Sequence, residues 1–253
     1  MAVKNTPSLI AFETQVKKTT SKANQKEIEL LTNTLNMYIN GFNSIGSFTY
    51  NQDNEKETAW LLLVTRSFHS MRSALQLMLM GYYGQAISVL RTVTENFFIC
   101  HDCIANPKAI EAILHNKYRI PDSNQKLSFR QMASRTGNMK IYEQDYAHQS
   151  AVTHPSALSL GIIRDPKTNT INVSPRYDKI LFLDCCEMVF RNALMMNEFM
   201  ARLLEKLSSK TKATSWAEKA KQTIEEASDW LKRMREEFGN ITSLKQEEKN
   251  HGN

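Results

Sequence analysis

Apolar residues recur every three or four positions along most of this 253-residue chain, which is the spacing of one face of an α-helix. The densest of these patterns runs from Glu57 to Pro107 and is interrupted once, at Gly81 to Gly84. Glycine is unfavourable inside a helix but suits a position where a helix ends, so the interruption predicts a tight turn between antiparallel helices. We expect this helical hairpin to form the centre of the fold.

Two narrower apolar seams with heptad-like spacing lie outside the hairpin. Their positions are Ile28, Leu31, Leu35, Tyr38, Phe42 and Ile45 in the first seam, and Trp216, Ala220, Thr223, Ala227, Trp230 and Met234 in the second. Such seams suit packing along another helix, and the second suits either the body of the protein or a second copy of itself. Thr6-Pro7 predicts the start of the first helix, Ser215 with Glu218 predicts a capping box at the start of the last, and Gly239 predicts its end.

Residues 159–174 carry a different pattern. Leu160 to Ile163 and Ile171 to Val173 are short β-favouring runs on either side of a turn-forming segment at 165–169. We expect a small β-hairpin here. Because isolated two-stranded hairpins are only marginally stable, it should lie against the helices or against a partner chain.

Together the patterns predict an all-α protein, a single multi-helix bundle built on the central hairpin with the β-hairpin as an insertion. The expected organisation is an N-terminal helical arm at 1–56, a core domain at 57–208, a C-terminal heptad helix at 209–240 and a disordered tail at 241–253. The composition agrees, because 42% apolar residues suffice for a sizeable core, while 8 Gly and 6 Pro are few for a chain built from strands.

No segment predicts export or membrane insertion. The N-terminus lacks the apolar stretch of a signal peptide, and the longest uncharged run, Ser73 to Leu90, contains polar and glycine residues that suit the hairpin bend. The four cysteines fall inside helical patterns, which favours reduced thiols in a cytoplasmic protein; they are Cys100, Cys103, Cys185 and Cys186. A zinc site is the alternative, but adjacent cysteines diverge on a helix, so we expect no metal and no other cofactor.

The net charge of +6 comes mainly from one region. Residues 106–176 contain ten Lys and Arg against five Asp and Glu, whereas residues 177–253 contain thirteen of each. A local excess of this size permits contact with RNA or another anionic ligand, and a solvated basic face explains it equally well.

A polar stripe crosses the second helix of the hairpin. Arg91, Glu95 and Asp102 fall on one side of that helix, opposite its most apolar face. Because apolar residues also flank the stripe, we expect it to be buried against neighbours, with Arg66 and His69 of the preceding helix as partners. Such a cluster is either a structural lock or a binding site.

A second group of candidates lies in the polar and aromatic stretch at 146–156. His148 and His154 are candidates for an acid–base pair, or for a phosphate site beside Arg135, and Tyr146 lies in the same stretch. The alternative is that Tyr146 and His148 are helix surface and that His154 caps a helix end, which must come before Pro155.

Several short segments resemble a bacterial domain of unknown function numbered 5677. They are Gly81-Tyr-Tyr-Gly-Gln-Ala86, Leu90-Arg-Thr-Val-Thr-Glu95, Asn106-Pro107 and Thr153-His-Pro-Ser156, together with Tyr146. The resemblance covers roughly residues 60–200 and implies an all-helical fold in which Arg91, Glu95 and His154 are the distinctive polar positions. The helical build is also similar to HEPN ribonucleases of prokaryotic defence and toxin systems, although their arginine-to-histidine spacing of four to six residues does not occur here.

Two functions are therefore expected. The first is a helical binding or regulatory module of the bacterial cytoplasm that acts through self-assembly or a partner protein, in defence or stress response. Phosphate-loop, dinucleotide, serine-hydrolase and helical zinc-protease motifs are absent from the sequence, which favours this reading. The second is a metal-independent ribonuclease or related phosphodiesterase, with His148 and His154 as acid and base and Arg91 or Arg135 on phosphate.

Overall fold

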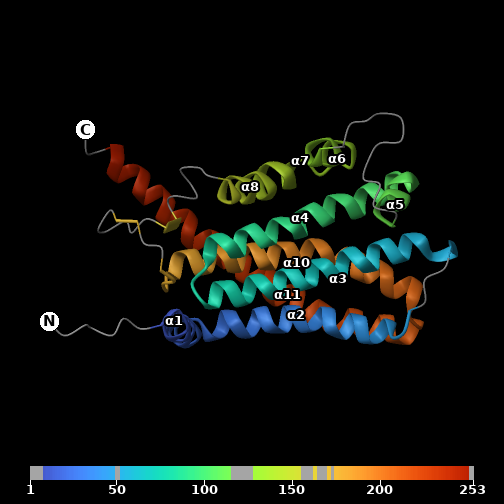
Figure 1. The fold of residues 1–253 in the computed structure, drawn as a ribbon, viewed down its shortest axis with the longest axis horizontal. Coiled ribbons are helices and arrows are strands. Elements are labelled where there is room, and N and C mark those ends of the chain that lie inside the picture. Colours follow the sequence, from blue (N-terminus) through green and yellow to red (C-terminus); the bar gives the residue numbers. More distant parts are fainter. Residues whose placement is uncertain are drawn as a thin grey trace.

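The computed structural model describes residues 8–48, 52–114, 128–154, 162–163, 170–171 and 174–250. Within these ranges the chain is a bundle of helices without a β-strand, so the predicted all-α fold is confirmed (Figure 1). Helices α3 (Glu55–Leu79) and α4 (Tyr83–Ala105) form the centre, and α10 (Lys179–Leu207) packs against both. No helix in these ranges combines the length and the apolar character that crossing a membrane requires.

The turn between α3 and α4 is the one predicted from the glycines. Gly81 has a φ of 85°, a left-handed conformation that favours glycine. A Cβ atom at this position would lie 2.5 Å from the carbonyl oxygen of Arg176. The turn is therefore in close contact with the segment that leads into α10, which ties the hairpin to the third central helix.

Gly81→Ala is expected to destabilise the fold by about 2 kcal/mol, because the new side chain would strain the backbone and collide with a main-chain atom. Gly84→Ala is the matched control, since its Cβ would meet Ile162 at an ordinary 3.7 Å. Thermal denaturation should show a clear loss of Tm for the first variant only. Equal Tm values would contradict this description of the turn.

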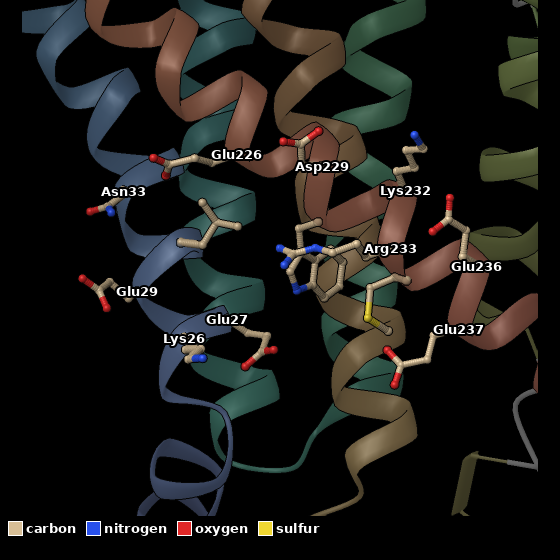
Figure 2. Close-up of a pocket in the computed structure, with 13 residues that line it drawn as sticks. Lys26, Glu27, Glu29, Asn33, Glu226, Asp229, Lys232, Arg233, Glu236 and Glu237 are labelled. Atoms are coloured by element: carbon tan, nitrogen blue, oxygen red, sulfur yellow. The ribbon is translucent and has the colours of Figure 1, made fainter.

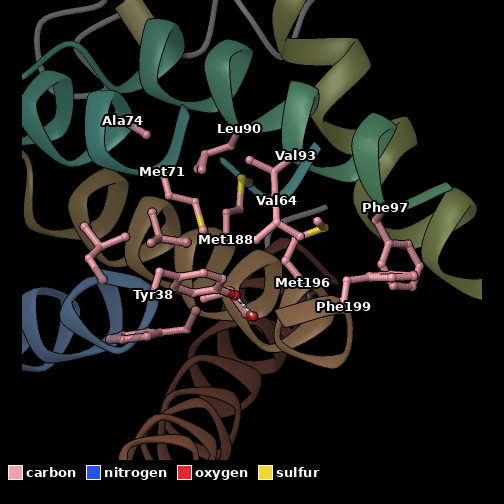
Figure 3. Packing of buried hydrophobic residues seen from close by; sticks show 14 of the residues in the cluster. Tyr38, Val64, Met71, Ala74, Leu90, Val93, Phe97, Met188, Met196 and Phe199 are labelled. Carbon is pink, nitrogen blue, oxygen red and sulfur yellow. Dashed lines mark hydrogen bonds between the residues drawn. The ribbon is translucent and has the colours of Figure 1, made fainter. Parts of the chain in front are cut away.

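The core lies where α2 (Gln25–Ile45), α3, α4 and α10 meet, and Figure 3 shows it from close by. Its fully buried side chains are mainly aromatic, leucine and methionine residues, among them Tyr38, Met71, Leu90, Met196 and Phe199. The hydroxyl of Tyr38 donates a hydrogen bond to the backbone carbonyl of Ala193, so the polar end of this buried ring has a partner. Burial raises the pKa of Tyr38, which keeps the hydroxyl protonated.

Both apolar seams are used inside the chain. The first belongs to α2, where Leu31 and Leu35 are buried, and the second belongs to α11 (Lys210–Asn250), which packs along α2 and α10. The indole N–H of Trp216 in α11 donates to the carbonyl of Met37 in α2 at 2.9 Å. The buried seam residues are therefore covered within one chain and do not offer a surface to a second copy.

Helix α11 is longer than the sequence predicts at both ends. It begins at Lys210, so Ser215 and Glu218 are exposed residues inside the helix and not its cap. Its backbone continues past Gly239 to Asn250, where the sequence predicts a disordered tail from residue 241. A single glycine costs only about 1 kcal/mol in a helix, and the Lys- and Glu-rich segment after it has good helix propensity.

Shorter elements complete the bundle. They are α1 (Leu9–Ala23), η1 (Gln52–Asn54), α5 (Pro107–Leu114), α6 (Phe129–Arg135), α7 (Met139–Ile141), the π-helical turn η2 (Tyr142–Tyr146) and α8 (Ala147–Thr153). Elements α6, η2 and α8 lie along α4, on the side away from α2 (Figure 1). The predicted helix start at Thr6-Pro7 falls outside the described residues, and Ser8 caps α1 by accepting a hydrogen bond from the N–H of Ala11.

The predicted β-hairpin at 159–174 falls mainly outside the described residues. Within the described part, Ile162 and Ile163 have helical geometry where the first strand was predicted, and Ile171 is a single bridge residue. No hairpin is therefore seen in the part of this segment that the structure describes. An apolar run this short fits a helical turn as well as a strand, so periodicity alone does not separate the two.

Candidate active site

Four polar side chains from two separate parts of the sequence meet between α4 and α8. They are Arg91 and Glu95 of α4, Tyr146 at the end of η2 and His154 directly after α8, and we name them the α4–α8 cluster. Arg91 Nε donates to Glu95 Oε1 at 2.9 Å, and Arg91 Nη2 donates to the Tyr146 hydroxyl at 2.8 Å. Arg91 Nη1 lies 3.4 Å from Nε2 of His154. Four of the predicted candidates thus share one place.

The spacing along each helix explains how these side chains reach one another. Arg91 and Glu95 are four residues apart and lie on one side of α4, with side chains 21% and 22% exposed. Helix α8 ends at Thr153, and His154 has extended backbone angles of φ −93° and ψ 152°, as expected for a residue that proline follows in the sequence. His154 is exposed, so it is the member of the cluster that a ligand reaches first.

Tyr146 is the buried member of the cluster, at 8% exposure. Its ring packs on Phe129 and Tyr142, with centroid distances of 5.5 and 5.2 Å, and the Arg91 guanidinium lies 5.0 Å from its centroid. Burial raises the pKa of Tyr146, although the neighbouring Arg91 cation acts in the opposite direction. The hydroxyl therefore stays protonated, accepts from Arg91 and donates to Glu95 Oε1 at 3.4 Å.

The contact between Arg91 and His154 favours one tautomer of the neutral imidazole. Arginine can only donate hydrogen bonds, so the arrangement is favourable when Nε2 is unprotonated and the ring proton sits on Nδ1. A separation of 3.4 Å is long for such a bond, so the two groups are held near each other but not locked together.

A layer of buried polar residues lies next to the cluster, between α4, α8 and α10. The Thr94 hydroxyl lies 2.9 Å from Oε1 of Gln149 and 3.0 Å from Oδ1 of Asn192, and all three residues are at most 1% exposed. The layer links α4, α8 and α10, and Thr94 directly precedes Glu95. Sequence reasoning missed these residues, because a polar residue on an apolar helix face is the only signal they leave and it does not name the partner.

The second predicted histidine, His148, has different neighbours. It faces α10, where its Nε2 lies 3.9 Å from Oδ2 of Asp184, while His154 faces α4. The structure therefore does not bring the two histidines together as an acid–base pair. Close by, Arg191 Nη2 binds the largely buried Asp145 carboxylate at 2.9 Å, which makes this side of α8 a charged contact with α10.

The Asp184 carboxylate raises the pKa of His148, although burial acts in the opposite direction. A histidine whose pKa is raised in the folded state adds stability at acidic pH, and this is lost as the pH rises through the folded-state pKa. We therefore expect His148→Gln to lower the Tm at about pH 5.5 and to change it little at about pH 8. The loss should not exceed about 1 kcal/mol, because both side chains are 38% exposed.

The exposed His69 gives the matched control for this pH comparison. His69→Gln should leave the Tm close to that of the parent at both pH values. An equal effect of His148→Gln at acidic and alkaline pH would show that its charge does not interact with Asp184.

The remaining sequence-predicted site residues lie elsewhere. Arg66 and His69 are exposed on α3, and none of the described hydrogen bonds or ion pairs joins them to the stripe on α4. Asp102, the third member of that stripe, is buried and forms an ion pair with Arg135 of α6. Arg135 is therefore held away from the α4–α8 cluster by a carboxylate of its own.

The four cysteines are buried free thiols. Burial raises the pKa of Cys100 and Cys185 well above the ordinary value, which disfavours the thiolate that metal binding requires. In the part of the chain that the structure describes, no three His, Cys, Asp or Glu side chains are grouped so that they could hold a metal ion.

A groove of about 870 Å³ lies between α2 and α11, away from the α4–α8 cluster (Figure 2). Its lining carries six carboxylates against three cations, with Arg233 near its centre. An excess of negative charge repels phosphate groups, so this groove does not suit the RNA or other anionic ligand expected from the basic region of the sequence.

Comparison with known proteins leaves the geometry as the only guide to function. The chain matches no family model, no curated protein and no solved structure. The resemblance to the domain numbered 5677 and the likeness of build to HEPN ribonucleases therefore stay predictions.

Proposed function

We propose that this protein is a metal-independent ribonuclease and that the α4–α8 cluster is its active site. One observation carries the proposal: Glu95 and His154, a carboxylate and an imidazole, lie on either side of one guanidinium group, that of Arg91. Cleavage of a phosphodiester by general acid–base catalysis needs a base, an acid and a cation to stabilise the phosphorane-like transition state. The cluster contains one of each.

The choice of RNA follows from the nucleophile. Among the described contacts of the cluster, no serine, threonine or cysteine side chain reaches His154 or Glu95 to act as a protein nucleophile. A substrate that carries its own nucleophile suits such a site, and in RNA the ribose 2′-hydroxyl is next to the phosphate. The excess of Lys and Arg in residues 106–176 favours a polyanion over a neutral ester.

The proposed reaction is an internal transesterification. Glu95 removes the proton of the 2′-hydroxyl, and the 2′-oxygen attacks phosphorus. Arg91 and the Tyr146 hydroxyl hold the non-bridging oxygens, and His154, as the imidazolium, gives its proton to the departing 5′-oxygen. The products are a 2′,3′-cyclic phosphate and a free 5′-hydroxyl, so no metal-bound water is consumed.

The hydrogen bonds within the cluster fit these roles. Both bonds to Glu95 use Oε1, which leaves Oε2 as the oxygen that takes the proton. A phosphate would take the place of the long 3.4 Å contact between Arg91 Nη1 and His154 Nε2, because the two nitrogens lie too close together to hold a phosphate between them. This assignment replaces the His148–His154 pair predicted from the sequence with the Glu95–His154 pair.

The test compares three single-stranded substrates in the presence of EDTA: an oligoribonucleotide, its 2′-O-methyl form and the matching DNA. Cleavage of the first only is expected, because the other two lack a free 2′-hydroxyl. Cleavage of DNA, or loss of all activity on metal removal, would contradict the proposed chemistry.

A second candidate is a binding or regulatory module without turnover. It is favoured by the charge balance of the cluster, in which Glu95 neutralises Arg91 and the partners of Arg91 are already in place. Such a module would bind phosphate-bearing ligands and leave RNA intact. Self-assembly was expected from the two apolar seams, but both seams are covered within the chain, so this support for it is lost. Light scattering after gel filtration measures the oligomeric state directly.

A further inference from the structure

A pocket of about 290 Å³ lies beside the α4–α8 cluster. It is formed by the hairpin turn and first turns of α4, the end of α8, the pair Ile162 and Ile163, and residues 174–176. Ser88 of its lining is one helical turn before Arg91, and Thr153 directly precedes His154. The pocket therefore lies next to the place where the scissile phosphate would sit.

The walls of the pocket are part apolar and part polar. Val152 is buried and Ile162 half-buried, which provides apolar sides for a flat ring. Two glycines in the lining, Gly81 and Gly84, add no side chain, so the space stays open. Its volume lies at the small end of the range for ligand pockets, about 300 Å³, which suits one ring system and not a larger molecule.

Two of the hydroxyl groups in the lining, those of Ser88 and Thr153, have a defined polarity. The Ser88 hydroxyl donates its proton to the Gly84 carbonyl at 2.8 Å, and the Thr153 hydroxyl donates to the Gln149 carbonyl at the same distance. Each hydroxyl has only one proton, so both oxygens offer lone pairs to a ligand. Gln85, which is exposed at the rim, offers both a donor and an acceptor.

From these features we infer that the pocket binds the nucleobase next to the cleaved phosphate and prefers adenine and cytosine, which carry an amine at position 6 and position 4, over uracil, which carries a carbonyl at position 4. The inference rests on the proposed ribonuclease function. The amine supplies the donors that the Ser88 and Thr153 oxygens accept, whereas a carbonyl at the same position would face lone pairs.

The test measures binding of adenosine, cytidine and uridine 3′-monophosphates by calorimetry. The parent should bind the first two roughly fivefold more tightly than the third, the effect of about one net hydrogen bond. Gly84→Leu should abolish binding of all three, because the side chain fills the pocket, while Gly84→Ala adds only a methyl group at an ordinary 3.7 Å from Ile162 and should bind like the parent.

A second variant keeps the test decisive if Gly84→Leu does not fold. Thr153→Val preserves the shape of the side chain and removes one acceptor, so it should reduce the preference for the amine-bearing bases by a few-fold. Equal binding of the three nucleotides by the parent, or an unchanged preference in Thr153→Val, overturns the assignment of the pocket.

These results test the base pocket and the ribonuclease reaction independently of each other. If RNA is cleaved but Gly84→Leu binds and cleaves with the parent's base preference, the pocket is wrong and the ribonuclease stands. If RNA stays intact while the nucleotides bind with the expected preference and Gly84→Leu loses them, the catalytic proposal falls and the base pocket stands. His154→Ala should keep the base preference in either case, because His154 is placed on the phosphate.

Discussion

His154→Ala is expected to lower kcat/KM for RNA cleavage by about 10²–10⁴-fold, the usual contribution of a general acid. The variant should melt close to the parent, because His154 is exposed and its one described contact with Arg91 is long. Steady-state cleavage of a fluorescent oligoribonucleotide, together with thermal denaturation, measures both effects.

Glu95→Gln should reduce activity to a similar extent, because the amide keeps an oxygen for Arg91 but cannot take a proton. The side chain is 22% exposed, so the cost in stability should be about 1 kcal/mol and not the 3 to 5 kcal/mol of a fully buried pair. The matched control is His148→Gln, which changes a histidine on the other side of α8. If His148→Gln were as inactive as His154→Ala, the site would be misplaced.

Arg135→Ala should have the largest effect on stability, about 3 kcal/mol. The Asp102 carboxylate that Arg135 binds is only 3% exposed, and without the guanidinium it is left as an uncompensated buried charge. The Arg135 side chain itself is 39% exposed, which places the expected loss at the lower end of the range for buried pairs. Urea denaturation of the parent and the variant gives the value.

Arg130→Ala, an exposed arginine on the same helix, is the control for Arg135→Ala and should change stability by less than about 0.5 kcal/mol. Asp102→Asn removes the buried charge itself and should cost less than Arg135→Ala. Similar stability of the two arginine variants would mean that Asp102 finds solvent or another partner. Arg135→Ala, Arg130→Ala and Asp102→Asn should each keep the activity of the α4–α8 cluster, provided that the variant folds.

The hairpin and the bundle could be predicted from local features alone. Apolar periodicity marks α3 and α4, and Gly81 marks the turn, because these signals depend on backbone geometry and burial within a few residues. The two apolar seams could also be predicted from the sequence. The surface that covers each seam could not, because a heptad stripe needs a complementary surface without specifying whether it lies in the same chain.

In the candidate site, too, the local contact could be predicted from the sequence and the long-range contacts could not. The Arg91–Glu95 pair follows from a spacing of four residues on one helix. Its meeting with Tyr146 and His154 depends on how α8 packs on α4, some fifty to sixty residues later, and no local pattern contains that information. Whether Arg66 and His69 reach this pair could not be predicted either, because α4 is apolar on nearly all sides, so its pattern does not say which face meets α3.

One error could have been avoided from the sequence. His148 and His154 are six residues apart, which places them about 120° apart around a helix, so they were poor candidates for one acid–base pair. The wrong start predicted for α11 has a different cause. The capping-box pattern at Ser215 and Glu218 is a frequent combination of helix-favouring residues, and it marks an end only where the preceding chain leaves the helix.

The most direct measurement of the central claim is the chemical identity of the cleavage product. Mass spectrometry of a short oligoribonucleotide incubated with the protein in EDTA should find a 2′,3′-cyclic phosphate on the upstream fragment and a 5′-hydroxyl on the downstream one. Both should be absent with Glu95→Gln and with His154→Ala. Intact RNA with the folded parent protein, or the same product in equal yield from either variant, would contradict an acid–base site built from Glu95, Arg91 and His154.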